Sequence, residues 1–260
     1  MGYWHDIYII RNKIEHEYKF VGHYGKKGEK KASRKKPTPE QMELYNRINK
    51  AKKIRRTTDL NFEPRDYWVM LPDKKGKTMP EAKQDFKELA DKLRYEYKKR
   101  GCVLKWMRVI EIGKKGGLHI HLIVNRIADT DILISENWKH GHPYFKHLYE
   151  EGDYEQLASY MAKLPEKEDG KEPEKSREER MAKLTKENYS YSTSRNLVRP
   201  EPAEHHRYLR RTLERAIRDG PKPTPGYEVD KSSIRTGVNK FTGMSYLYYT
   251  ERLIKEKRRE

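Results

Sequence analysis

Two histidines one residue apart lie in an apolar run that strongly constrains the local structure. The run reads Gly116-Gly117-Leu118-His119-Ile120-His121-Leu122-Ile123-Val124. A short apolar run that follows glycines is typical of a β-strand. Because side chains on a strand alternate between its two faces, His119 and His121 point to one side, whereas Leu118 and Ile120 point to the other. The strand therefore presents two imidazoles from a rigid backbone.

A carboxylate can join these two imidazoles. Glu111 lies eight residues before His119, near the end of a strand predicted over 103–112. The glycine-rich turn 113–117 should make the two strands an antiparallel hairpin, which can bring Glu111 over the histidine face. Two imidazoles and a carboxylate leave positions on a divalent ion for water or substrate oxygens. We expect Mg²⁺ or Mn²⁺ there, while zinc and a metal-free pair of packed histidines remain open.

A tyrosine and a lysine follow at helical spacing. Residues 153–164 predict a helix that Pro165 ends, and Tyr160 and Lys163 share one face of it. A phenol with a pKa of about 10 is a poor nucleophile at neutral pH. Attack on a phosphodiester therefore needs a metal that polarises the phosphate and a nearby cation, which Lys163 can supply. Most of the 19 tyrosines must have packing or stacking roles, and such a role is the alternative to catalysis for Tyr160.

The charge of the chain indicates a polyanionic partner. Its 58 Lys and Arg exceed its 40 Asp and Glu, for a net charge of +18. This charge favours nucleic acid and also suits an anionic membrane surface. No apolar run is long enough for a membrane span and no signal segment is visible, so we expect no membrane partner and a cytoplasmic location. Cys102 is the only cysteine, which excludes an internal disulfide and a cysteine-based zinc finger.

The order of the predicted elements indicates an α+β fold with an antiparallel sheet. A strand over 66–71 precedes a helix from Pro80 to Gly101, and the hairpin follows. A further strand over 141–148 and the helix over 153–164 complete the plan. We expect the helices to pack on one face of the sheet.

Composition divides the chain into four predicted parts. These are a basic N-terminal arm with a helix over 1–60, a core over 61–165, a charged linker over 166–187 and a basic C-terminal region over 188–260. In the last part, apolar residues at helical spacing predict a helix over 202–219. The arginines of that helix either contact a phosphate backbone or form a solvated face.

The histidine strand and the tyrosine helix together resemble the HUH endonuclease superfamily. More closely, the chain resembles rolling-circle replication initiators of bacterial plasmids and phages. Glu111 precedes the histidines, and an interval of about 40 residues separates His121 from Tyr160. Further similar stretches extend over most of the chain, namely Tyr67-Trp68-Val69, Trp138-Lys139-His140-Gly141, Ser194-Arg195-Asn196-Leu197 and Thr242-Gly243. The chain departs from these initiators at Met70-Leu71-Pro72, so we assign no catalytic role there.

This resemblance implies an RNA-recognition-like sheet whose central strands carry the metal ligands His119, His121 and Glu111. It also implies that Tyr160 nicks and religates single-stranded DNA at a replication origin, through a 5′-phosphotyrosine linkage and a free 3′ hydroxyl. Lys163 would assist this attack. A polymerase would extend the hydroxyl, and a host helicase is a further candidate partner. A transposase or relaxase with the same chemistry, and a non-catalytic protein that binds single-stranded nucleic acid, remain alternatives.

Several other residues are weaker candidates. Lys114, Lys115 and Arg126 could contact DNA phosphates, although solvated charges at these positions would look the same. Tyr189 and Tyr191 could supply a second nucleophile, although such residues more often pack or stack on bases. Three histidines near a predicted turn could be extra metal ligands or surface residues, namely His140, His142 and His147.

Overall fold

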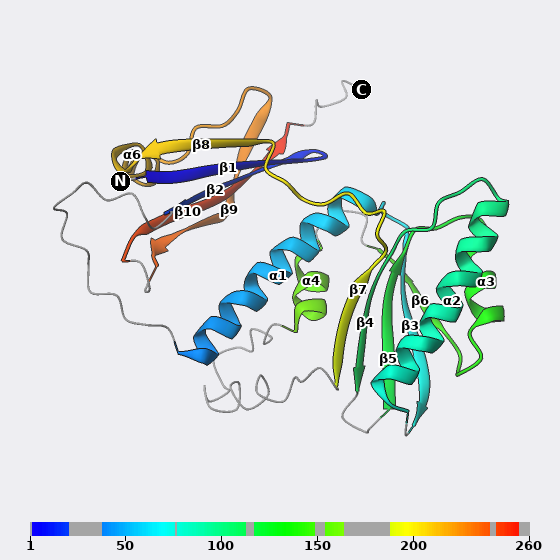
Figure 1. Ribbon diagram of the computed structural model, residues 1–260. Helices are drawn as coiled ribbons and strands as arrows, with labels where there is room; N and C mark the ends of the chain where they lie inside the picture. The colour runs from blue at the N-terminus through cyan, green and yellow to red at the C-terminus, as the bar shows by residue number, and fades with distance from the viewer. Residues whose placement is uncertain are drawn as a thin grey trace. The chain divides into compact units, whose positions relative to one another are not determined.

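The chain folds as two units, each with its own antiparallel sheet. One unit is drawn from residues 1–42 and 200–260, and the other from residues 43–199. Each contains a five-stranded sheet (Figure 1), which confirms the predicted α+β class with antiparallel strands. The computed structural model describes residues 2–20, 38–75, 77–112, 117–148, 154–163, 188–239 and 243–254.

The sheet of the 43–199 unit contains the histidine strand. Its strand order is β6-β3-β5-β4-β7, and neighbouring strands run antiparallel. The strands are β3 (Tyr67–Lys75), β4 (Trp106–Ile112), β5 (Gly117–Val124), β6 (Tyr144–His147) and β7 (Tyr189–Thr193). The predicted hairpin of β4 and β5 is present. Because β5 is the central strand, hydrogen bonds on both sides hold its backbone.

Helices pack on both faces of this sheet (Figure 1). On one face, α2 (Met79–Lys99) and α3 (Thr130–Asn137) cover apolar side chains of β5. On the other face, α1 (Pro39–Asn61) and α4 (Glu155–Ala162) cover Met107, Val109 and Ile123. The sequence predicted helices on one face only. The second helical layer forms because those three residues make part of the histidine face apolar.

The sequence of α2 accounts for both of its ends. The backbone N–H of Thr78 donates to Glu81 Oε2 at 2.7 Å, as in a capping box, and Pro80 lies in the first turn. Apolar residues at helical spacing are buried against the sheet, and the helix ends before Gly101, whose φ is +68°. These local signals explain why the sequence predicted this helix closely.

The other unit joins residues from the two ends of the chain. Its strand order is β8-β1-β2-β10-β9. A two-residue turn, Arg11-Asn12, connects β1 to β2, and Arg11 adopts a φ of +53°. The strands are β1 (Gly2–Ile10), β2 (Lys13–Phe20), β8 (Glu204–Leu209), β9 (Tyr227–Val238) and β10 (Ser245–Leu253), and α6 (Arg210–Asp219) follows β8.

Several elements differ from those that the sequence predicted. The predicted helix over 202–219 begins only at Arg210, because 204–209 pair with β1 as a strand. Strand β3 continues past Pro72 to Lys75, with an irregular register after the proline. The two units divide the chain after residues 42 and 199, because strands from both ends of the chain share one sheet.

Two expectations concern regions on which the structure says less. The predicted charged linker over 166–187 lies outside the described residues. Among the helices that are described, none combines the length and the apolar character needed to cross a membrane.

Candidate active site

The hairpin of β4 and β5 forms the floor of the candidate site. Across the two strands, Glu111 lies opposite His119. Leu118 and Ile120 are buried in the core beneath α2, so His119 and His121 project from the opposite face, as predicted. The carboxylate and both imidazoles therefore lie on one surface of the sheet.

Tyr160 on α4 reaches this surface. Its hydroxyl donates to Glu111 Oε1 at 2.6 Å and lies 2.7 Å from His121 Nε2. His121 Nε2 and Glu111 Oε1 are themselves 2.9 Å apart. The ammonium of Lys163 forms an ion pair with Glu111 Oε2 and lies 4.2 Å from the centroid of the Tyr160 ring. Three residues chosen from the sequence thus meet around the carboxylate of a fourth, Glu111.

The end of α4 orients Lys163 toward that carboxylate. Ala158 and Met161 are buried on the inner side of the helix, which fixes its rotation. The helix ends at Lys163, where the backbone turns to a φ of +55°. The guanidinium of Arg47 on α1 donates to the Lys163 carbonyl at 3.1 Å. Lys163 therefore caps the helix instead of continuing it, and α1 holds its backbone.

Burial sets the charge state of the imidazoles. His121 is 8% exposed, and burial lowers its pKa to about 4, so the ring is neutral at pH 7. Burial and the nearby His121 also lower the pKa of His119. A neutral imidazole keeps a lone pair that can accept a proton or bind a metal ion. Tyr160 is 36% exposed, which leaves part of its side chain accessible to a ligand.

Trp68 on β3 completes the group, and the sequence did not predict its place there. Its ring stacks on the imidazole of His121, with centroids 5.2 Å apart and planes at 15°. It also meets the Tyr160 ring edge to face at 6.0 Å. The alternation of side chains along β3 could have predicted this position. Val69 and Leu71 are core residues, so Trp68 between them and Tyr67 must face the histidines.

The imidazoles and the carboxylate of this site are types of ligand that bind divalent ions, but not all of their ligand atoms lie close together. Among the described residues, the Nδ1 atoms of His119 and His121 are buried with no hydrogen-bond partner. However, His119, His121 and Glu111 do not bring three ligand atoms within 4.8 Å of one another. His119 shares the face of His121 and lies opposite Glu111 in register.

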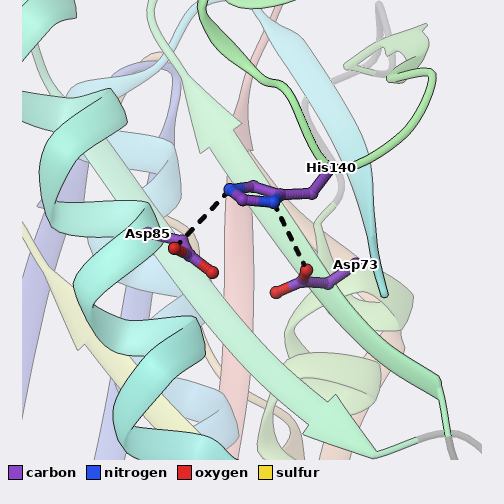
Figure 2. Close-up of side chains that lie close together, drawn as sticks. All are labelled: Asp73, Asp85 and His140. Carbon is purple, nitrogen blue, oxygen red and sulfur yellow. Dashed lines mark ion pairs between the residues drawn. The ribbon is translucent and has the colours of Figure 1, made fainter. Parts of the chain in front are cut away.

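A second group of possible ligands lies beside α2. Figure 2 shows the His140 imidazole between the carboxylates of Asp73 and Asp85. The His140 ring nitrogens lie 4.0 Å from Asp73 Oδ1 and 3.5 Å from Asp85 Oδ1. However, the ammonium of Lys77 forms ion pairs with both carboxylates, at 3.0 Å from Asp73 Oδ1, and lies 3.2 Å from His140 Nδ1. An ammonium of the chain itself thus offsets one of the two carboxylate charges, and its contacts tie β3 to α2.

Of the three candidate DNA contacts, the structure describes only Arg126. Arg126 follows β5 at the end away from Gly117, and its guanidinium lies 5.3 Å from the centroid of the Tyr67 ring. Its backbone N–H donates to Asp66 Oδ1 at 2.7 Å. Lys114 and Lys115 lie outside the described residues.

Tyr189 and Tyr191 occur in β7, beside β4. The Tyr189 hydroxyl donates to the Met161 carbonyl of α4 and lies 3.0 Å from the ammonium of Lys50. Burial raises the pKa of Tyr189, and it raises the pKa of Tyr191 to about 12. These contacts give Tyr189 a structural role in holding α4. Of the other histidines, His147 donates a hydrogen bond from its Nδ1 atom to the Arg65 carbonyl, 3.0 Å away.

The part of the chain that carries this geometry is similar to a known family. Residues 67–168 match the family model of the replication-associated protein ORF2/G2P. No curated protein and no solved structure matches the chain significantly. The matched range contains Trp68, Glu111, both histidines of β5, Tyr160 and Lys163. The match supports a role as a replication initiator.

Proposed function

We propose that the chain nicks and rejoins single-stranded DNA at a replication origin, with Tyr160 as the nucleophile. The observation that carries this proposal is the position of the Tyr160 hydroxyl, 2.6 Å from Glu111 Oε1 and 2.7 Å from His121 Nε2. A phenol needs a proton acceptor and a source of positive charge to attack a phosphodiester at neutral pH. The carboxylate of Glu111 and the ammonium of Lys163 meet these two needs.

The proposed reaction exchanges one phosphate ester for another. The Tyr160 oxygen forms a bond to phosphorus while the bond between phosphorus and the 3′ oxygen breaks. The phenol proton passes to Glu111, and the departing 3′ oxygen takes a proton from solvent. The products are a 5′-phosphotyrosine and a free 3′ hydroxyl, which a polymerase can extend. Because the linkage conserves the energy of the ester, the reverse reaction religates the strand.

A divalent ion, Mg²⁺ or Mn²⁺, held by His119, His121 and Glu111 would polarise the scissile phosphate. The protein residues have further tasks. Lys163 steadies negative charge on the phenolate and on the phosphate as it develops. Trp68 stacks on His121 and limits the orientations of its ring. The net charge of +18 favours the approach of DNA.

A random library of single-stranded DNA tests the proposal without knowledge of the origin sequence. The full chain is incubated with the library and Mn²⁺, and DNA that stays attached to protein in detergent is recovered and sequenced. The wild type should yield adducts that share a sequence, linked through a 5′ phosphate. Tyr160→Phe should yield none. Tyr144→Phe is the matched control, because Tyr144 is 61% exposed on β6 of the same sheet.

Two results would contradict the proposal. Adducts formed by Tyr160→Phe would show that another residue is the nucleophile. Cleaved strands with no adduct in the wild type would show hydrolysis by water instead of attack by a side chain.

A further inference from the structure

Helix α6 is fixed on the sheet of the 1–42 and 200–260 unit by one side only. Leu213 is fully buried against Tyr3, Tyr18, Leu247 and Tyr249. Ala216 and Ile217 pack at the edge of the same core. These three residues follow helical spacing, so they define the inner side of α6 and fix which side chains face outward.

Three arginines form a stripe on the outward side of α6. Arg211, Arg215 and Arg218 are four and three residues apart, which aligns them along one helix face opposite Leu213. All three are exposed. Within the described residues Arg211 and Arg215 make no ion pair, and the side chain of Arg218, which pairs with Asp219, is 75% exposed. The stripe is about 10 Å long along the helix axis.

For its length, α6 carries more net positive charge than α2. Its ten residues contain four arginines and two acidic residues. The longer α2 also has an exposed side, but its sequence balances six Lys and Arg against five Asp and Glu. Arg210 is paired with Glu214 on the flank of α6, at 2.7 Å, whereas Asp219 contacts the stripe only at its end, through Arg218. The result is a concentrated line of positive charge on a rigid support.

We propose that this stripe, Arg211, Arg215 and Arg218, binds the phosphate backbone of duplex DNA. The phosphates of each strand repeat about every 3.4 Å along the axis of a duplex, so a 10 Å line of long arginine side chains that lies along this axis can reach about three of them. Platforms for single strands also stack bases on aromatic side chains, and no aromatic residue occurs in α6. The stripe therefore suits backbone contacts without sequence readout.

This inference goes beyond the cleavage reaction and rests on the DNA partner proposed above. It gives the two units different tasks, with single-strand chemistry in residues 43–199 and duplex contact in the other unit. Because the two tasks use different DNA, they can be tested separately.

The test compares the salt dependence of duplex binding among three forms of the full chain. These are the wild type, a variant with Arg211→Gln, Arg215→Gln and Arg218→Gln, and a control with Lys83→Gln, Lys87→Gln and Lys92→Gln on α2. Fluorescence anisotropy with a short duplex of random sequence measures Kd across a salt series. Loss of three phosphate contacts should make the slope of log Kd against log salt shallower by about 3 in the α6 variant. The α2 control should keep the wild-type slope.

Three results would overturn the inference. The first is an α6 variant with the wild-type slope, and the second is an α2 control that loses as much. The third is an α6 variant that loses as much affinity for single-stranded DNA as for duplex DNA, which would show that the stripe is not specific for duplex. Formation of the Tyr160 adduct on single strands should stay unchanged, so failure here is separable from failure of the cleavage proposal. If hydrogen exchange shows that the triple variant unfolds α6, Arg215→Gln alone should change the slope by about 1.

Discussion

Both sheets place a histidine beside a carboxylate, but the surroundings differ. In the sheet of the 43–199 unit, His121 and Glu111 are reached by Tyr160, which is partly exposed. In the other sheet, His16 lies 3.4 Å from Glu251, and Glu251 is completely buried. Both histidines are therefore buried, but the carboxylate and the tyrosine beside His121 are partly accessible, whereas Glu251 is enclosed.

The enclosed group is a stack of rings. His16 stacks on Tyr249 at 4.4 Å, and His5 stacks on Tyr18 at 3.8 Å. His5 Nε2 and His16 Nδ1 are 2.9 Å apart. Burial lowers the pKa of His5 to about 3 and raises the pKa of Tyr18 to about 12. The comparison teaches that accessibility, more than residue type, separates a candidate reactive site from a packed polar core.

Substituting the histidine of each sheet in turn should give the largest difference in cleavage rate between two variants. His121→Ala should lower the rate of strand cleavage by about 100-fold or more, since it removes a group in contact with the nucleophile. His16→Ala should leave cleavage close to wild type but destabilise its own unit by about 1–3 kcal/mol, because buried partners lose their hydrogen bonds. Cleavage rates and hydrogen exchange of β2 measure the two effects. Equal loss of cleavage in both variants would break the comparison.

Metal affinity should separate the two groups of possible ligands in the 43–199 unit. Glu111→Gln should weaken Mn²⁺ binding by about tenfold or more, because it replaces a carboxylate ligand with an amide. Asp85→Asn should leave Mn²⁺ affinity unchanged, since the Lys77 ammonium already pairs with this carboxylate. Electron paramagnetic resonance of free Mn²⁺ gives both affinities on the full chain. If instead Asp85→Asn weakens Mn²⁺ binding and Glu111→Gln does not, the ion binds at Asp73, Asp85 and His140.

Removing the ring that stacks on His121 should have a moderate effect. Trp68→Ala should lower the cleavage rate by about 2- to 10-fold, which corresponds to the free energy of one aromatic contact. Trp68→Phe should retain most of the rate, because it keeps a ring against the imidazole. The Mn²⁺ affinity should fall in parallel with the rate in Trp68→Ala. If the phenylalanine variant is as slow as the alanine variant, stacking is not what Trp68 contributes.

The smallest expected effect is a pH dependence of the enclosed group. Because the folded-state pKa of His5 is about 3 and the ordinary value is 6.5, the unfolded chain binds more protons between these values. The stability of this unit should therefore fall as pH drops from about 6.5 toward 3. Hydrogen exchange of β1 at pH 7 and pH 5 measures the change, after correction for intrinsic exchange. His5→Phe keeps a stacked ring without a titrating group and should show a smaller fall.

Much of the candidate site could be predicted from the sequence, because its parts are encoded locally. Alternation along β5 places His119 and His121 on one face, and a short turn makes Glu111 face His119. Helical spacing predicted that Tyr160 and Lys163 lie together, and they do, although Lys163 caps the helix. The contact between α4 and the hairpin, in contrast, could be predicted only from the family resemblance, because Tyr160 follows His121 by 39 positions. Trp68 was missed because its role depends on the neighbouring strand.

By itself, the sequence determined the elements whose signals lie within a few residues of one another. The α2 helix, with its cap and apolar spacing, and the β4–β5 hairpin are such elements. Only the tertiary structure decided that residues 204–209 are a strand and that both ends of the chain share a sheet, with β1 paired to β8. Local propensity favoured a helix there, but hydrogen bonds to β1 and burial of Tyr3 and Leu213 are gained only when distant segments meet. Periodicity within one segment carries no information about its partner, which is why the second sheet was not predicted.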